Sequence, residues 1–262
     1  MMARGALDVL PLWGLFLATL IVILLSVEAG YRLGKRRRAL GQEEMEAPVG
    51  SMVGVTLGLL AFMLAFTFSM GAERFEARRR VLLEETNAIG TAYLRAGLLP
   101  DPQQSEIRRL LREYVDARLE GVQPGRLAHA MQRSEELHGL LWSQAVAAAA
   151  GNPGSIMAGL FVQSLNEVID VHSKRVQASL RSRIPTSIWG TLYVLAVLGV
   201  SAMGYHAGLT GSSRSLAVLA LALAFSSVML LISDLDRPQE GLLKVSQQLM
   251  IDLRNSINAQ TP

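Results

Sequence analysis

One stretch decides the fold class: residues 51–71, which read SMVGVTLGLLAFMLAFTFSMG. It contains no charged residue and no proline. A helix rises about 1.5 Å per residue and the hydrocarbon core of a bilayer is about 30 Å thick, so a stretch of this length can cross it. We interpret residues 51–71 as a membrane-spanning helix.

Three further stretches are also predominantly apolar and long enough to span a bilayer, at residues 10–33, 184–209 and 214–233. Basic residues at 35–38 follow the first of them directly, as expected of a retained helix rather than a cleaved signal peptide. The whole chain is 50% hydrophobic and only 18% charged, too apolar for an ordinary soluble domain. The sequence therefore predicts an all-α integral membrane protein with four transmembrane helices.

Helical periodicity continues beyond the second span. Phe75, Leu82, Ile89 and Ala96 recur every seven residues, which predicts one long helix that leaves the bilayer. We expect this face to contact neighbouring chains. Pro/Gly-rich turns at 100–102, 123–125 and 152–154 then divide the following residues into further helices.

The predicted organisation is two membrane helices, a soluble bundle and two membrane helices. A polar hairpin at 34–50 joins the first pair, and the soluble helical domain occupies 72–183. An amphipathic segment at 234–262 ends the chain, either packed on the bundle or lying at the membrane interface.

Side chains that could carry out chemistry are scattered. The chain has no cysteine, and its four histidines lie singly, so we expect them on helix surfaces. No nucleophile with a base, no metal-ligand cluster and no phosphate-binding loop is recognisable. The sequence therefore predicts a protein without enzyme activity, cofactor or metal. Basic residues cluster beside the membrane segments without interleaved aromatic residues, as in headgroup anchoring rather than nucleic-acid binding.

Two polar features lie near membrane depth. Glu28 is an intramembrane carboxylate, which either faces a functional pathway or bonds to Arg32 one helical turn later. Asp234, Asp236 and Arg237 follow the fourth span. These two carboxylates cap helices, pair with arginine or bind a cation, and we favour the first two roles.

Small and aromatic residues recur at four-residue steps in the second span. Gly54 and Gly58 form a small surface that permits close helix approach, and Phe62 and Phe66 continue the same stripe. The stripe is either a packing or lipid-facing surface, or a hydrophobic constriction formed by several symmetry-related helices.

Four segments resemble a known family. AFMLAF at 61–66, followed by RFEAR at 74–78, resembles the neck-helix region of bestrophins. NAIGTAYLR at 87–95 and DLDRP at 234–238 resemble the two signatures of a bacterial bestrophin-like family labelled DUF4239.

Bestrophins are pentameric ion channels whose second membrane helix lines the neck. The resemblance implies that Phe62 and Phe66 are pore-lining, with Gly58 where bestrophins have a larger apolar residue. It also implies a homo-oligomer, most simply a pentamer, that passes small inorganic ions. The alternative is a non-conducting membrane scaffold or sensor whose soluble bundle binds a partner.

Two charge signals bear on the orientation in the inner (plasma) membrane. The basic residues at 35–38 favour a cytoplasmic hairpin, whereas a larger number of basic residues flank the soluble segment. The bestrophin resemblance agrees with the larger number. We therefore predict that the soluble domain and both termini are cytoplasmic.

Overall fold

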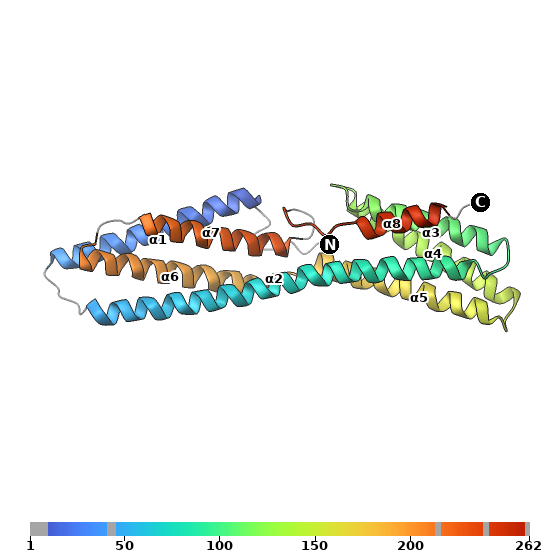
Figure 1. Ribbon diagram of the computed structural model, residues 1–262, viewed down its shortest axis with the longest axis horizontal. Coiled ribbons are helices and arrows are strands. Elements are labelled where there is room, and N and C mark those ends of the chain that lie inside the picture. The colour runs from blue at the N-terminus through green and yellow to red at the C-terminus, as the bar shows by residue number, and fades with distance from the viewer. Residues whose placement is uncertain (1–9, 41–45, 213–215, 238–240, 260–262) are drawn as a thin grey trace. The chain divides into compact units, whose positions relative to one another are not determined.

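The computed structural model describes residues 10–40, 46–212, 216–237 and 241–259. Throughout these ranges the regular structure is helical, and no strand occurs (Figure 1). The elements are α1 (Leu12–Ala39), α2 (Glu46–Ala96), α3 (Gln103–Glu120), α4 (Leu127–Gly151), α5 (Ile156–Val176), η1 (Gln177–Arg181), α6 (Thr186–Thr210), α7 (Leu216–Asp236) and α8 (Gln248–Ala259).

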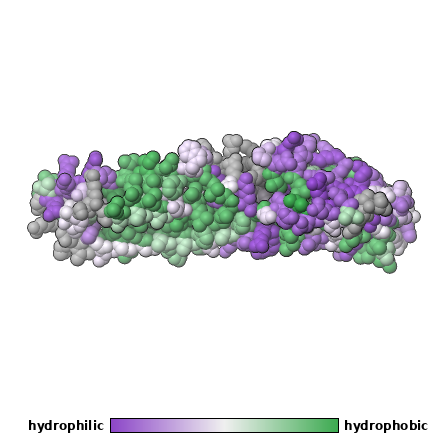
Figure 2. Space-filling model, turned by 45° about the horizontal axis from the view of Figure 1, so that its top comes forward, coloured by the Kyte–Doolittle hydropathy of each residue, from purple (hydrophilic) through white to green (hydrophobic). Residues whose placement is uncertain are grey.

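The chain divides into two compact units. The membrane unit comprises Met1–Phe75 and Ser182–Leu243, and the bundle unit comprises Glu76–Arg181 and Lys244–Pro262. Four helices, α1, α2, α6 and α7, are long and apolar enough to cross a membrane. Figure 2 shows hydrophobic residues over most of the visible surface of the membrane unit and hydrophilic residues over most of the bundle unit.

Glycines bring α1 and α6 into backbone contact. A Cβ atom added at Gly30 or Gly34 of α1 would collide with the carbonyl oxygen of Ser201 or Tyr205. On α6, a Cβ at Gly204 or Gly208 would likewise collide with the backbone of α1. In lipid, helices associate through such close packing rather than through a hydrophobic driving force.

A hydrophobic core and one hydroxyl pair accompany this contact. Fully buried side chains of the membrane unit include Leu192 of α6 and Met229 of α7. The hydroxyl groups of Thr19 and Tyr193 lie 2.7 Å apart between α1 and α6. The three helices α1, α6 and α7 thus form one packed group.

The long second helix is confirmed. Residues Glu46–Ala96 form one uninterrupted α-helix, which runs through both units (Figure 1). The expectation that its heptad face contacts neighbouring chains is wrong for Leu82 and Ile89. Both are buried inside the same chain's bundle, because α3, α4 and α5 supply the apolar partners that the face needs.

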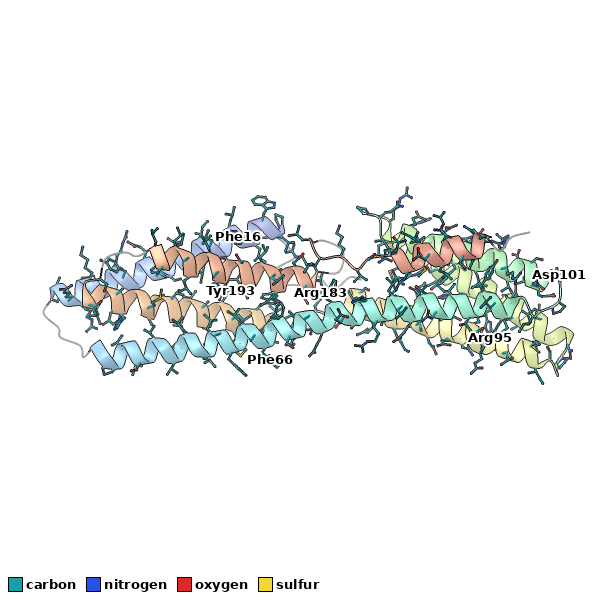
Figure 3. The ribbon with its side chains drawn as sticks, in the orientation of Figure 1. Phe16, Phe66, Arg95, Asp101, Arg183 and Tyr193 are labelled. Carbon is teal, nitrogen blue, oxygen red and sulfur yellow. The ribbon has the colours of Figure 1, made fainter. Side chains whose placement is uncertain are left out.

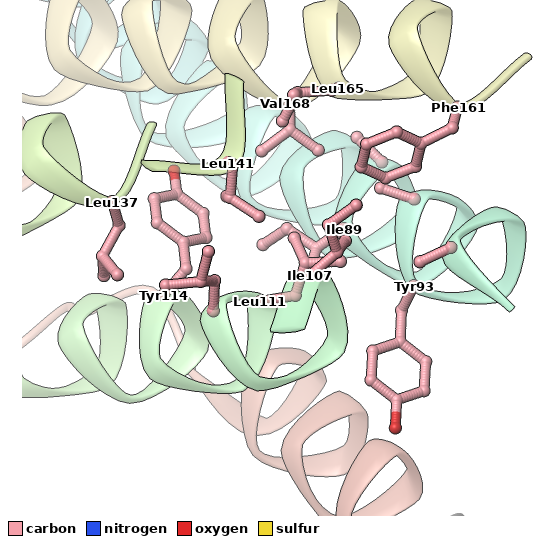
Figure 4. Packing of buried hydrophobic residues seen from close by; sticks show 14 of the residues in the cluster. Ile89, Tyr93, Ile107, Leu111, Tyr114, Leu137, Leu141, Phe161, Leu165 and Val168 are labelled. Atoms are coloured by element: carbon pink, nitrogen blue, oxygen red, sulfur yellow. The ribbon is translucent and has the colours of Figure 1, made fainter. Parts of the chain in front are cut away.

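The bundle unit has a dense apolar core (Figure 4). Ile89, Ile107, Tyr114, Leu141 and Leu165 are fully buried and come from four different helices. The C-terminal helix α8 packs on this core as well, since Met250 is fully buried within it. Of the two predicted positions for the amphipathic segment, the structure shows packing on the bundle.

The helical geometry changes shortly before the third span. The helix α5 ends at Val176, and a π-helical turn covers Gln177–Arg181. Pro185 follows closely, and a proline disfavours helical geometry in the residue before it. The predicted ranges 34–50, 214–233 and 234–262 each include residues outside the described part of the chain.

Candidate functional site

The predicted neck stripe lies on the outer face of α2. Phe62 is 65% exposed and Phe66 is 54% exposed in the protomer. Gly54 and Gly58 are exposed, and a Cβ added at either would meet nothing within 4 Å. Figure 3 shows Phe66 projecting from α2. The stripe is therefore an apolar surface that the described part of the protomer does not cover.

The opposite face of α2 is packed, and this packing determines which way the stripe points. Val53, Leu60 and Thr67 are buried. A Cβ added at Gly199 of α6 would meet the Leu57 side chain at 3.2 Å, so the two helices are close there. Rotation of α2 about its axis would expose this buried face, so the outward direction of Phe62 and Phe66 follows from the packing.

Asp234 and Asp236 both accept backbone hydrogen bonds. The Asp234 carboxylate receives the N–H groups of Leu242 at 2.8 Å and Leu243 at 3.0 Å. The Asp236 Oδ1 atom receives the N–H of Ile184 at 3.0 Å, just before α6 begins. These two side chains thus tie the end of α7 to the segment that follows it and to the residues just before α6.

Arginines complete this junction. Arg183 donates to the backbone oxygen of Asp236 at 2.6 Å, and its Nη1 lies 3.7 Å from the Asp236 carboxylate. Arg237 donates to the carbonyl oxygen of Leu10 at 2.7 Å. All these contacts lie within the membrane unit. The pairing of Asp236 with Arg183 is of the kind that we favour, and the roles of these side chains stay a prediction. Pro238, the last residue of the DLDRP signature, lies outside the described residues.

Glu28 makes the local bond that was one of its two predicted roles. The Arg32 Nε atom donates to the Glu28 carboxylate at 2.7 Å. The Arg32 side chain is 77% exposed and that of Glu28 is 29% exposed. Glu28 also lines a hollow of about 530 Å³ between α1, α6 and α7, together with Tyr31 and Met203.

The structure reveals a buried ionic cluster that we did not predict. Glu85 of α2 is completely buried and pairs with Arg118 of α3 at 2.8 Å and with Arg175 of α5. The Tyr114 hydroxyl donates to the same carboxylate at 3.2 Å and lies 3.1 Å from Nδ1 of His172. Three helices of the bundle unit are thereby joined through one carboxylate.

Two histidines belong to this cluster, which corrects their predicted surface positions. His172 is buried and His138 is half-buried, because both rings pack on Tyr114 in the bundle interior. The two imidazole rings lie 4.9 Å apart in an edge-to-face arrangement. The sequence could not indicate this proximity, because the two histidines lie in different helices.

Burial and charge shift the pKa values of the cluster in consistent directions. Burial alone would raise the pKa of Glu85, but Arg118 and Arg175 outweigh it, so the pKa lies below its usual value. Burial, assisted by Arg118, lowers the pKa of His138 and His172 to about 4. At neutral pH the carboxylate is thus ionised and both imidazoles are neutral.

One signal in the sequence could have located this cluster. Glu85 lies three residues after Leu82 and four before Ile89, so it shares their buried helix face. A carboxylate on a core-facing stripe requires cationic partners. The sequence could not name these partners, since Arg118 and Arg175 are far away along the chain.

Comparisons with known proteins identify the family. A family model described as the Bestrophin-like domain matches residues 14–250. The solved structure of a bacterial bestrophin homologue from Klebsiella pneumoniae aligns with a TM-score of 0.67 at 15% identity, covering 95% of this chain and 98% of that one. A mutant of that homologue aligns with a TM-score of 0.69 at 15% identity, covering 93% and 98%.

A further structure, described as a membrane protein, aligns with a TM-score of 0.68 at 15% identity, covering 95% of this chain and 97% of that one. At this identity the structural matches show a shared fold. No match was found among curated proteins. The matching description is the bestrophin-like one, and the narrower DUF4239 label stays a prediction. Because the family model covers most of the chain, this protein belongs to the bestrophin-like family.

Proposed function

We propose that this protein is an oligomeric ion channel in which α2 of each copy lines a hydrophobic neck. The observation that carries the proposal is the open apolar stripe on α2, with Phe62 and Phe66 more than half exposed. Membership of a family whose members are ion channels supports it. We propose no enzymatic activity.

The four apolar helices of one copy are too few to enclose a neck. In the protomer α2 turns one packed face to its neighbours, whereas the phenylalanine face has no such cover. Several copies arranged around one axis would bring these faces together. We propose a ring of identical chains, five by analogy with bestrophins, with two membrane helices on either side of an inserted soluble bundle.

Within such a ring, Phe62 and Phe66 would form two aromatic collars about 6 Å apart along the axis, because they are four residues apart in a helix. Collars of this kind exclude water from a narrow pore and block ions without bearing charge. The soluble bundle and both termini would be cytoplasmic. Asp234, Asp236 and Arg237 would serve to hold the membrane unit together rather than to bind an ion.

The double substitution Phe62→Ala/Phe66→Ala tests this function. Removing both rings should widen the narrowest point and raise ion flux into liposomes above the wild-type level. Thermal stability in detergent should change little, because the rings make few contacts within the protomer. The oligomeric mass in native lipid discs should also be unchanged.

The scaffold alternative predicts a different outcome. If the phenylalanines are packing groups in a non-conducting protein, the double variant should lose several kcal/mol of stability, as large-to-small core substitutions do. Flux should then be absent from both proteins. Loss of stability without flux would refute the channel function.

A further inference from the structure

One charged residue continues the phenylalanine face of α2. Glu73 lies seven residues after Phe66, and at about 100° per residue this is only about 20° short of two full helical turns. The axial separation is about 10 Å. Ser69, which lies between them near the same face, is exposed as well. The Glu73 side chain therefore projects from the same side of α2 as Phe62 and Phe66.

The Glu73 carboxylate has no oppositely charged partner among the described residues. Its side chain is exposed, and no ion pair links it to any residue in the part of the chain that the structure describes. The adjacent Arg74 is directed elsewhere, since it donates to the carbonyl oxygens of Met70 at 3.1 Å and Arg183 at 3.2 Å. The next carboxylate along α2, Glu76, has Arg79 at 3.8 Å.

Two aromatic collars cannot distinguish the sign of an ion, because dewetting blocks cations and anions alike. Charge preference must therefore come from polar groups near the collars. The separation between Phe66 and Glu73 is about one Debye length at physiological ionic strength, so an ion at the end of the neck experiences the charge on Glu73. Symmetry would multiply this charge by the number of copies.

We propose that Glu73 is the residue that sets charge selectivity, forming with its copies a carboxylate ring that favours small monovalent cations over anions. This inference rests on the proposed function, since a ring exists only if α2 helices of several copies surround one axis. Charged rings of this kind raise the local concentration of the oppositely charged ion and repel the other.

Reversal potentials measured in planar bilayers under a KCl gradient test the proposal. The wild type should reverse near the potassium equilibrium potential. Glu73→Gln should lower the potassium-to-chloride permeability ratio by roughly tenfold. Glu73→Lys should move the reversal potential past zero, towards the chloride equilibrium potential. Each substitution should be made both in the wild type and in the Phe62→Ala/Phe66→Ala background, so that a closed neck does not prevent measurement.

Glu135→Gln is the matched control. Glu135 is an exposed glutamate on α4, away from the phenylalanine stripe in sequence, and its removal changes the net charge by the same amount. It should leave the reversal potential unchanged. Currents with unaltered selectivity in Glu73→Gln and Glu73→Lys would overturn this inference and leave the channel function standing. Absence of current in every background would refute the channel function itself, and this inference with it.

Discussion

Two pairs of glycines in the membrane unit have the same spacing and opposite environments. Gly204 and Gly208 of α6 press against the backbone of α1, where an added Cβ atom would collide with carbonyl groups. Gly54 and Gly58 of α2 face open space, with nothing within 4 Å of an added Cβ. Both pairs consist of small residues four positions apart, so the spacing alone does not tell which pair is packed against another helix.

These two environments distinguish a helix contact made within the protomer from a helix surface that stays open. The α1–α6 contact is satisfied within one chain, so its glycines serve folding. The α2 stripe, from Gly54 to Phe66, has no partner among the described residues of the same chain and is available to other copies or to lipid. We singled out the α2 pair from the sequence and did not predict the α1–α6 contact.

The largest expected effect comes from filling the two glycine pairs. Gly204→Leu/Gly208→Leu should abolish the folded protomer, because side chains would have to occupy the space of the α1 backbone. Gly54→Leu/Gly58→Leu should leave the protomer folded. Thermal unfolding by circular dichroism and the yield of monodisperse protein in detergent measure both. An equal loss of stability in the two double variants would contradict the different roles of the two glycine pairs.

Charged groups extend the same comparison to the bundle unit. Glu85→Gln leaves the buried Arg118 and the partly buried Arg175 without a counter-charge, which should cost about 3–5 kcal/mol. The ion pair of Glu106 with Arg109 is 2.7 Å long but exposed, so Glu106→Gln should cost far less stability than Glu85→Gln.

Tryptophan fluorescence can report on this unit alone. Trp142 lies in α4, while Trp13 and Trp189 lie in the membrane unit, so a Trp13→Phe/Trp189→Phe background isolates the bundle signal. Denaturant unfolding in that background should separate the two glutamate variants. A small effect of Glu85→Gln would show that the buried cluster contributes little to stability.

A smaller effect is expected from pH. In the unfolded chain His138 and His172 take up protons near their ordinary pKa of about 6.5, whereas in the folded bundle their pKa is about 4. The unfolded state therefore binds more protons between these values, and the free energy of unfolding falls as the pH is lowered from about 6.5 to about 4. Between pH 7 and pH 5 we expect a loss of at most about 2 kcal/mol for each histidine.

The same fluorescence assay at several pH values measures this slope. A His138→Gln/His172→Gln variant has no imidazoles in the cluster, so its stability should depend much less on pH over this interval. Glu85 adds a further loss only at lower pH, where its carboxylate takes up a proton. A wild type whose stability stays constant between pH 7 and pH 5 would contradict the burial of these neutral histidines.

Features that depend on residues close together in the chain can be read from the sequence. Four apolar stretches, the unbroken helix α2 and the phenylalanine stripe follow from composition and from spacings of three, four or seven residues. Glu28 bonding to Arg32 is of the same kind. Local helix geometry decides these features, so they could be predicted without the tertiary fold.

Which surfaces contact each other depends on the three-dimensional fold. It placed Glu85 beside Arg175, 90 residues away, and brought His138 and His172 from separate helices onto Tyr114. It also buried Leu82 and Ile89 within the chain and left Phe62 and Phe66 outside. The physical reason is that a helix presents several faces of comparable polarity, and the partner that covers each face comes from distant residues.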